Sequence, residues 1–100
     1  MASIAFITLA AGANPEEHRT VLKTPGYDLV VVAVPDYAAA CAVAQELAAG
    51  GIDTIELCAG FGHLGVAEVA RAVPSAHVGA VRFDGHPRLG GKSGDTRFGP

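Results

Sequence analysis

Two pairs of polar residues stand at alternate positions where apolar stretches of the chain end. Glu56 and Cys58 lie two residues apart in IDTIELCA, residues 52–59, and Arg82 and Asp84 lie two apart at the end of AHVGAVRF, residues 76–83. Residues two apart in a β-strand share one face. If the two strands are neighbours, we expect both carboxylates, the thiol and the guanidinium to meet at one edge of a sheet.

Two histidines, His63 and His86, follow these strands in the adjoining loops. Carboxylates and imidazoles are the side chains that most often move protons, and a guanidinium can hold an anion or a developing oxyanion. We therefore predict Glu56, Asp84 and His86 as acid/base residues, with Arg82 and His63 binding the ligand. The alternative is a structural ion pair between Glu56 and Arg82 that neutralises a half-buried charge.

The chain has two cysteines, Cys41 and Cys58. Two cysteines in a chain with a sizeable core form no disulfide framework, so we expect free thiols and a cytoplasmic protein. Cys58 precedes a glycine-rich turn and a helix start, where a thiolate would be stabilised, but unpaired cysteine is more often a small core residue. We predict that Cys58 forms a wall of the ligand pocket.

Gly60, Gly62 and Gly65 spell G-x-G-x-x-G after a predicted strand and at the start of a predicted helix. This pattern is typical of dinucleotide sites, and the helix N-terminus alone can also hold a phosphate or carboxylate. Only 16 residues follow Asp84, which leaves no room for the second half of a dinucleotide fold. We therefore expect Gly60 and Gly62 to bind a small anion, without a cofactor.

A metal site is a further alternative, because His63, Asp84 and His86, together with Glu56, are possible ligands. The chain contains no closely spaced pair such as H-x-x-x-H, and we assign no metal. His18, in the first predicted helix, is expected to reach the same sheet edge and to contribute to ligand binding.

The last segment, residues 84–100, is rich in glycine and carries Arg88, Lys92 and Arg97. It has no apolar periodicity and reads as a flexible tail. A basic lid over an anionic ligand and a solvated or partner-bound terminus are both compatible with it. Gly91-Lys92-Ser93 resembles a phosphate loop, but no strand precedes it and no helical pattern follows.

Apolar runs and capping signals predict the elements that position these residues. Residues 3–10, 28–34, 52–59 and 76–83 read as strands; helices are expected from Asn14 to before Thr24, over 37–49, and from Gly62 to before Pro74. The β-α-β-α-β-α-β pattern predicts an α/β fold with a four-stranded, mostly parallel sheet and three crossover helices. Flavodoxin-like order 2-1-3-4 and half-barrel order 1-2-3-4 both remain open.

The composition bounds the function. One hundred residues suffice for a single domain, residues 1–100. A net charge of −3 with 17% charged residues argues against a nucleic-acid-binding protein, and no apolar run long enough for a membrane span and no signal peptide is present. Three helices cannot cover both faces of a parallel sheet, so we expect a homodimer.

The chain resembles a family of equally short microbial proteins classified only as a domain of unknown function. The resemblance covers nearly the whole chain and names no activity. It is carried by the segments His18-Arg19, Thr24-Pro25, Ile55-Glu56-Leu57-Cys58, Gly60-Phe61-Gly62, Val81-Arg82-Phe83-Asp84, His86-Pro87 and Ser93-Gly94-Asp95.

The residues together predict a protein that binds a small anionic or carbonyl-bearing molecule. As an enzyme it would be a cofactor-free isomerase, cyclase or lyase that works by acid/base chemistry. The alternatives are a nucleotide- or metabolite-binding module without catalysis and a structural partner subunit.

Overall fold

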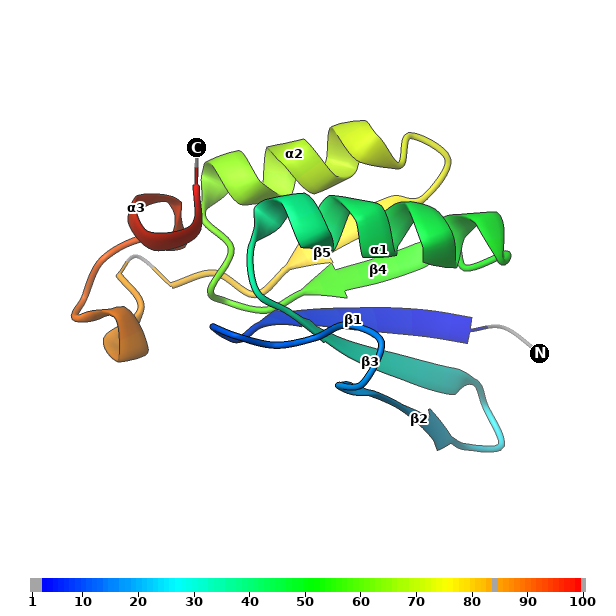
Figure 1. Ribbon diagram of the computed structural model, residues 1–100. Helices are drawn as coiled ribbons and strands as arrows, with labels where there is room; N and C mark the ends of the chain where they lie inside the picture. The colour runs from blue at the N-terminus through cyan, green and yellow to red at the C-terminus, as the bar shows by residue number, and fades with distance from the viewer. Residues whose placement is uncertain (1–2, 84, 100) are drawn as a thin grey trace.

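The computed structural model describes residues 3–83 and 85–99 as a five-stranded mixed sheet with two helices on one face (Figure 1). The Cα radius of gyration is 12.9 Å, as expected of a compact domain of this length. Asp84, predicted as an acid/base residue, lies outside the described residues. The elements are β1 (Ser3–Leu9), β2 (Arg19–Lys23), β3 (Asp28–Val34), α1 (Tyr37–Ala49), β4 (Thr54–Leu57), α2 (His63–Ala72), β5 (His77–Ala80), the 3₁₀ turn η1 (Pro87–Leu89) and α3 (Gly94–Phe98).

The sheet has the order β2-β3-β1-β4-β5. β1 is central and pairs in parallel with β3 along its whole length and with β4 on its other side, and β4 pairs in parallel with β5. The edge strand β2 runs antiparallel to β3. The α/β class and the mostly parallel sheet are therefore confirmed, but the sheet has five strands rather than four.

The prediction of a helix after Asn14 is wrong. Asn14 does begin a single turn, in which its side-chain oxygen accepts from the Glu16 amide at 3.0 Å and its carbonyl from the His18 amide at 2.8 Å. The chain then extends, because Arg19–Lys23 forms a hairpin ladder with β3 across the Thr24–Tyr27 turn. Pairing with an apolar strand outweighs a local capping signal of about 1 kcal/mol.

The crossover from β1 to β3 thus contains a strand instead of a helix. The four strands expected from the sequence lie in the relative order 2-1-3-4. A flavodoxin-like architecture is not confirmed, because a helix would be required in this crossover. The structure has three α-helices, but the third is the short α3 of the C-terminal segment.

Both long helices begin and end near the predicted positions and cover the same face of the sheet (Figure 1). Asp36 caps α1 by accepting from the Ala39 amide at 2.8 Å. The alanines of α1 allow close packing on the sheet, and Arg19 of β2 forms an ion pair with Glu46 of α1 at 3.0 Å. The core between helices and sheet is apolar throughout, with Ile7, Val32, Ile55, Leu57, Phe61 and Val69 fully buried.

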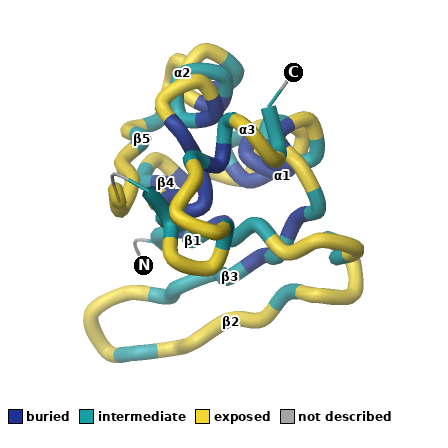
Figure 2. Tube along the Cα trace, turned by 90° about the vertical axis from the view of Figure 1, so that its left-hand side faces the viewer, coloured by how far each residue is buried: buried dark blue, intermediate teal, exposed yellow. Residues whose placement is uncertain are grey.

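The opposite side of the sheet is called the open face here. The register places Ile4 and Phe6 of β1 beside Leu29 and Val31 of β3 on this face, since alternate residues point to opposite sides. No helix covers it in the described part of the chain, and β2 is exposed along most of its length (Figure 2).

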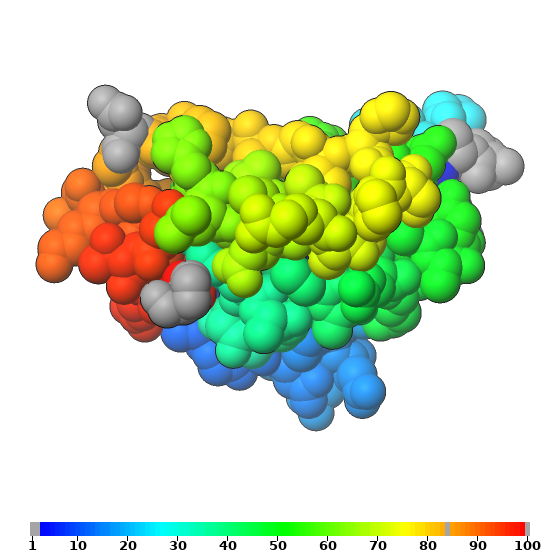
Figure 3. All heavy atoms as spheres, turned by 90° about the horizontal axis from the view of Figure 1, so that it is seen from above, coloured from blue at the N-terminus to red at the C-terminus, as the bar shows by residue number. Residues whose placement is uncertain are grey.

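The C-terminal segment is folded in residues 85–99 and packs against the start of α2 (Figure 3). Ser93 caps α3 by accepting from the Asp95 amide at 3.1 Å, and the Phe98 ring lies 6.3 Å from that of Tyr37. Among the described residues, no helix has the length and apolar composition needed to cross a bilayer.

Candidate functional site

Two adjoining cavities lie where the C-terminal segment covers the carboxyl ends of β1 and β4. We call them the inner cavity, of about 260 Å³, and the outer cavity, of about 290 Å³. Arg88 and Leu89 of η1 line both. The two cavities therefore form one depression at the edge of the sheet where ligands of parallel α/β proteins usually bind.

The inner cavity combines polar groups with an apolar wall. Thr8 and Cys58 come from the ends of β1 and β4, and His86 comes from the segment before η1. Leu9, Leu89 and Phe98 supply the apolar part of the lining. Three of the predicted site residues, Cys58, Gly60 and His86, are brought together here.

The Cys58 thiol is held against the end of β1. Its Sγ accepts from the Leu9 amide at 3.3 Å, and its own amide donates to the Ile7 carbonyl at 3.1 Å. The sulfur is thus tied to a backbone group while it lines the cavity. That Cys58 forms the wall of a ligand-binding pocket stays a prediction.

The His86 imidazole is fixed by its neighbours. Its Nδ1 accepts from the Arg88 amide at 3.0 Å, and its ring meets the Phe83 ring edge-on at 5.3 Å. Its backbone amide donates to the Lys92 carbonyl at 3.0 Å. With Nδ1 accepting, the proton of the neutral ring is on Nε2, so Nε2 can donate a hydrogen bond or its proton to a ligand.

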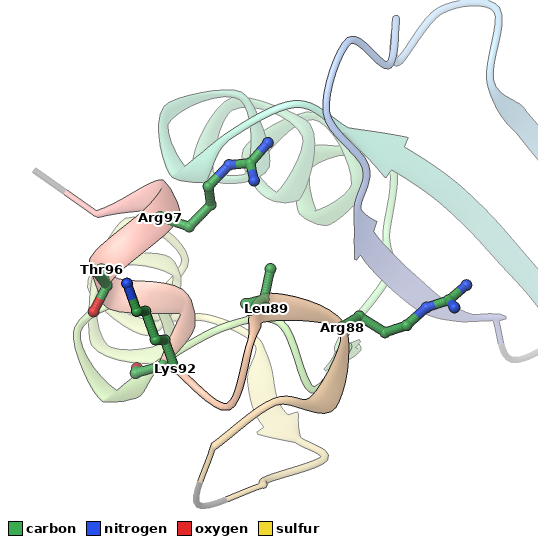
Figure 4. Close-up of a pocket in the computed structure, with 6 residues that line it drawn as sticks. Arg88, Leu89, Lys92, Thr96 and Arg97 are labelled. Atoms are coloured by element: carbon green, nitrogen blue, oxygen red, sulfur yellow. The ribbon is translucent and has the colours of Figure 1, made fainter.

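The outer cavity is basic. Arg88, Lys92 and Arg97 line it, and in Figure 4 Lys92 and Arg97 lie on one side of Leu89 while the Arg88 side chain extends away on the other. Ser93 and Thr96 add hydroxyl groups to the lining, and the Arg97 guanidinium is 5.5 Å from the centre of the Phe98 ring. Within residues 3–83 and 85–99 the one ion pair is Arg19–Glu46, so no described carboxylate neutralises these three cations.

The N-terminus of α2, where the glycine motif predicted an anion, is occupied by the chain itself. Asp95 of α3 accepts from the Leu64 amide at 3.2 Å, the Gly65 amide at 3.3 Å and the Tyr37 hydroxyl at 2.9 Å. The Tyr37 oxygen in turn accepts from the Gly62 amide at 2.9 Å. Gly62 therefore faces an internal carboxylate, which corrects the expected role of this helix end in ligand binding.

Two pKa values respond to this network. Burial, reinforced by the nearby Asp95 carboxylate, raises the pKa of Tyr37 to about 12, although the Gly62 amide acts in the opposite direction. Burial opposes ionisation of Asp95, but hydrogen bonds from Leu64, Tyr37 and Gly65 outweigh it and lower the pKa of the carboxyl. At neutral pH a neutral phenol therefore donates to a carboxylate.

The guanidinium of Arg82 also binds inside the chain. Its Nη1 donates to the Phe61 carbonyl at 2.6 Å, and its Nη2 lies 3.4 Å from His63 Nε2. Arg82 and His63 are thus brought together beside the start of α2. The expected ion pair between Arg82 and Glu56 is not formed.

Two further predicted residues lie away from the cavities. Glu56 is exposed on the open face, in register with Phe6 and Gly79. His18 is in the loop before β2, where its Nδ1 accepts from the Asn14 amide at 2.8 Å. The expected convergence of Glu56 with Arg82 is wrong, since alternation sends Glu56 to the side of the sheet opposite the helices.

The metal alternative required His63, Asp84 and His86, together with Glu56, to approach one another, and Asp84 lies outside the described residues. Over residues 3–83 and 85–99, no three histidine, cysteine, aspartate or glutamate side chains lie close enough to hold an ion. The inner and outer cavities therefore offer hydrogen bonds and cations to a ligand, rather than a described set of metal ligands.

Sequence reasoning assigned Arg88, Lys92 and Arg97 to a basic tail, with a lid over an anionic ligand as one of two alternatives, and did not name them as site residues. Tyr37 and Asp95 were missed altogether. Ser93, two residues before Asp95, is a typical helix N-cap residue, and this signal could have revealed the short helix that orients Asp95 and Arg97.

The chain belongs to a family of unknown function (DUF6506), whose family model matches residues 2–96. No curated protein and no solved structure gave a significant match.

Proposed function

We propose that this member of the DUF6506 family binds a small anionic, carbonyl-bearing molecule across the two cavities and catalyses proton transfer on it without a cofactor. The observation that carries the proposal is the junction of the two cavities at Arg88 and Leu89. One molecule can place its anionic group beside Lys92 and Arg97 and its uncharged end beside Arg88 and His86.

The outer cavity supports the anion-binding part. Arg97 can donate paired hydrogen bonds to a carboxylate or phosphate, and Lys92 adds a second positive charge. The protein has a net charge of −3, so its surface as a whole does not attract anions. The cations of the outer cavity would attract an anion only at this place.

The inner cavity supports the chemical part. The His86 Nε2–H can give its proton to the ligand's carbonyl oxygen while water takes a proton from the adjacent carbon. Return of a proton to another carbon of the enol, and of the oxygen's proton to Nε2, would complete an isomerisation. Arg88 lines the same cavity and can stabilise the enolate oxygen that forms in between. Leu9, Leu89 and Phe98 give this end an apolar wall.

A specific observation favours the second candidate, a binding module without catalysis. Proton transfer usually uses two groups, and Glu56, one of the three predicted acid/base residues, lies on the open face. Binding without turnover would then be the whole activity of the two cavities.

Titration calorimetry with inorganic phosphate and with pyruvate, at low salt, tests the binding step. We expect Lys92→Ala combined with Arg97→Ala to weaken binding at least tenfold, because two of the three cations are removed. The matched control is Arg71→Ala, at the exposed end of α2, which should leave the affinity unchanged. Equal affinities in the double variant and the wild type would overturn the site.

Exchange of the pyruvate methyl hydrogens in D₂O, followed by NMR, separates the two candidates. Catalysis predicts that the wild type accelerates exchange and that His86→Ala removes the acceleration while phosphate still binds. His77→Ala changes another exposed histidine and is the control. Binding without accelerated exchange of pyruvate would favour the binding module.

A further inference from the structure

The wall of the outer cavity combines cations with hydroxyl groups. Lys92 and Arg97 supply two positive charges. Ser93 and Thr96 supply two hydroxyls, and in Figure 4 Lys92 and Thr96 lie on the same side of Leu89. All four side chains can donate hydrogen bonds. The wall therefore suits a ligand group that has several acceptor atoms and no donor.

Both hydroxyl groups are available to a ligand. Ser93 Oγ accepts from the Asp95 amide at 3.1 Å, which uses a lone pair of the oxygen and leaves its proton to point elsewhere. Thr96 is exposed, and within residues 3–83 and 85–99 neither hydroxyl donates to an acceptor. A ligand can therefore receive two hydroxyl hydrogen bonds in addition to those of the cations.

The two cations match a doubly charged anion. Asp95, on the same segment, accepts from the amides at the start of α2 instead. A carboxylate has one charge and two oxygens, whereas a phosphate monoester has about 1.5 to 2 charges at neutral pH and three terminal oxygens. Guanidinium and ammonium groups both bind phosphate. A phosphate monoester can therefore use both cations and both hydroxyls, and a carboxylate can use only part of this set.

The inner cavity favours a short, hydroxylated chain for the rest of the ligand. Its volume of about 260 Å³ is below the roughly 300 Å³ at which pockets for drug-sized ligands begin. Thr8 and His86 line it with groups that can form hydrogen bonds to hydroxyls and to a carbonyl. A chain of a few carbons with such groups therefore fits this lining.

The aromatic lining of the inner cavity is poorly placed to stack on a planar base. Phe98 is the one phenyl ring in the lining. Its ring already lies 6.3 Å from that of Tyr37, and the Arg97 guanidinium is 5.5 Å from its centre. Because these contacts occupy the ring, a short chain fits better than a nucleobase.

We propose that the two cavities bind the phosphate monoester of a short hydroxycarbonyl compound. The phosphate group lies in the outer cavity and the carbonyl chain in the inner cavity. The ester bond lies between them, beside Arg88 and Leu89, which line both cavities. This inference rests on the proposed function and names the anionic group that the proposed function leaves open.

Titration calorimetry with two matched probes, at about pH 8 where the ester is a dianion, tests the inference. Glycerol 3-phosphate and 3,4-dihydroxybutanoate share the same hydroxylated chain and differ in the anionic group. Neither has a ketone or aldehyde group, so binding is measured without any reaction. We expect glycerol 3-phosphate to bind at least tenfold more tightly than 3,4-dihydroxybutanoate, and more tightly than inorganic phosphate because its chain reaches the inner cavity.

Thr96→Val removes one hydroxyl and keeps the shape of the side chain. We expect it to weaken the binding of glycerol 3-phosphate about fivefold, because one hydrogen bond to a charged group is lost in an open cavity. The affinity for 3,4-dihydroxybutanoate should change less than twofold. Thr96→Ser keeps the hydroxyl and should retain the wild-type affinities. Thr20→Val, which changes another exposed threonine on β2, is the control and should alter neither affinity.

The outcomes separate this inference from the proposed function. If the two probes bind equally well and the combined Lys92→Ala and Arg97→Ala variant weakens both, the anion site stands and the phosphate monoester is overturned. Tighter binding of adenosine 5′-monophosphate than of glycerol 3-phosphate would overturn the short chain. If neither probe binds and inorganic phosphate does not bind, the proposed function fails together with the inference. Circular dichroism checks the fold of each variant, and if Thr96→Val does not fold, the two probes on the wild type decide.

Discussion

Removal of the Asp95 carboxylate is expected to release the C-terminal segment from α2. The N-cap position of α2 is Gly62, which has no side chain with which to cap the helix. Asp95 supplies the missing cap from another element by accepting from the Leu64 and Gly65 amides. Asp95→Ala leaves both amides and the Tyr37 hydroxyl without this partner.

The magnitude follows from this role. Loss of a helix cap costs about 0.5–2 kcal/mol, and the Tyr37 hydroxyl adds one hydrogen bond to a charged acceptor, worth about 1.5–3 kcal/mol when desolvated. Asp95 is partly exposed, so solvent screening lowers both contributions. We expect Asp95→Ala to destabilise the docked segment by about 1–2 kcal/mol, and Asp95→Asn, which keeps one acceptor oxygen, by about half of that.

The same contact gives a pH dependence with a definite sign. The pKa of Asp95 is lower in the folded protein than its usual 3.8, so the folded state binds fewer protons than the unfolded state. The stabilisation is therefore fully present above pH 5 and is lost as the pH falls through the folded pKa, below 3.8. Asp95→Asn should remove this part of the acid sensitivity.

Amide hydrogen exchange of Leu64 and Gly65, measured by NMR, reports the docking directly, and thermal unfolding reports any global loss. A loss of 1 kcal/mol in global stability corresponds to about 4–8 °C in Tm for a domain of this size. Asp53→Asn, an exposed carboxylate that accepts only from the neighbouring Thr54 hydroxyl at 3.0 Å, is the control. Unchanged protection of Leu64 and Gly65 in Asp95→Ala would refute the reasoning.

Three other predictions concern the same region. Gly62→Ala should release the C-terminal segment as Asp95→Ala does, because a Cβ on Gly62 would overlap the Asp95 carboxylate. The losses of stability from the two substitutions should therefore not add in the double variant, and additive losses of Tm would contradict this. Iodoacetamide should modify Cys58 faster than Cys41, because burial and Glu68 raise the pKa of the Cys41 thiol. Phosphate should not slow the modification of Cys41. Peptide mass spectrometry measures both rates, and faster modification of Cys41 than of Cys58 would contradict this prediction. Asp95→Ala should also weaken phosphate binding in calorimetry, although Asp95 lines neither cavity. The reason is that the basic residues come together only in molecules whose C-terminal segment is docked on α2. An unchanged affinity for phosphate would show that docking by Asp95 is not needed for anion binding.

The sequence predicted the long elements well because their signals are local. The valine-rich run 28–34, the cap at Asp36 and the stop at Pro74 each specify one element, and the structure has them within a few residues. The segment after Asn14 could not be assigned this way. Its capping signal is genuine for one turn, but β2 owes its conformation to a ladder with β3, and that partner is visible only in the folded chain.

The candidate site was predictable only in part for a similar reason. Placement at the carboxyl edge follows from parallel topology and brought Cys58 and His86 to the right region. Whether Glu56 and Arg82 lie on the same side of the sheet depends on the register of β4 against β5, which one residue of slippage would invert. The basic cluster depends on how α3 docks, and five residues of helix give almost no periodic signal.

The glycine motif shows how a pattern can be correct about geometry and wrong about the ligand. Gly62 and Gly65 do let other groups approach the start of α2: a Cβ on Gly65 would overlap the Tyr37 ring, as one on Gly62 would overlap Asp95. The positive end of the helix does attract a carboxylate. That carboxylate is covalently part of the same chain, so its docking needs no ligand. The positive end of the helix therefore already has its anion within the protein. An external anion would be attracted by the cations of the segment that Asp95 anchors, which are Arg88, Lys92 and Arg97.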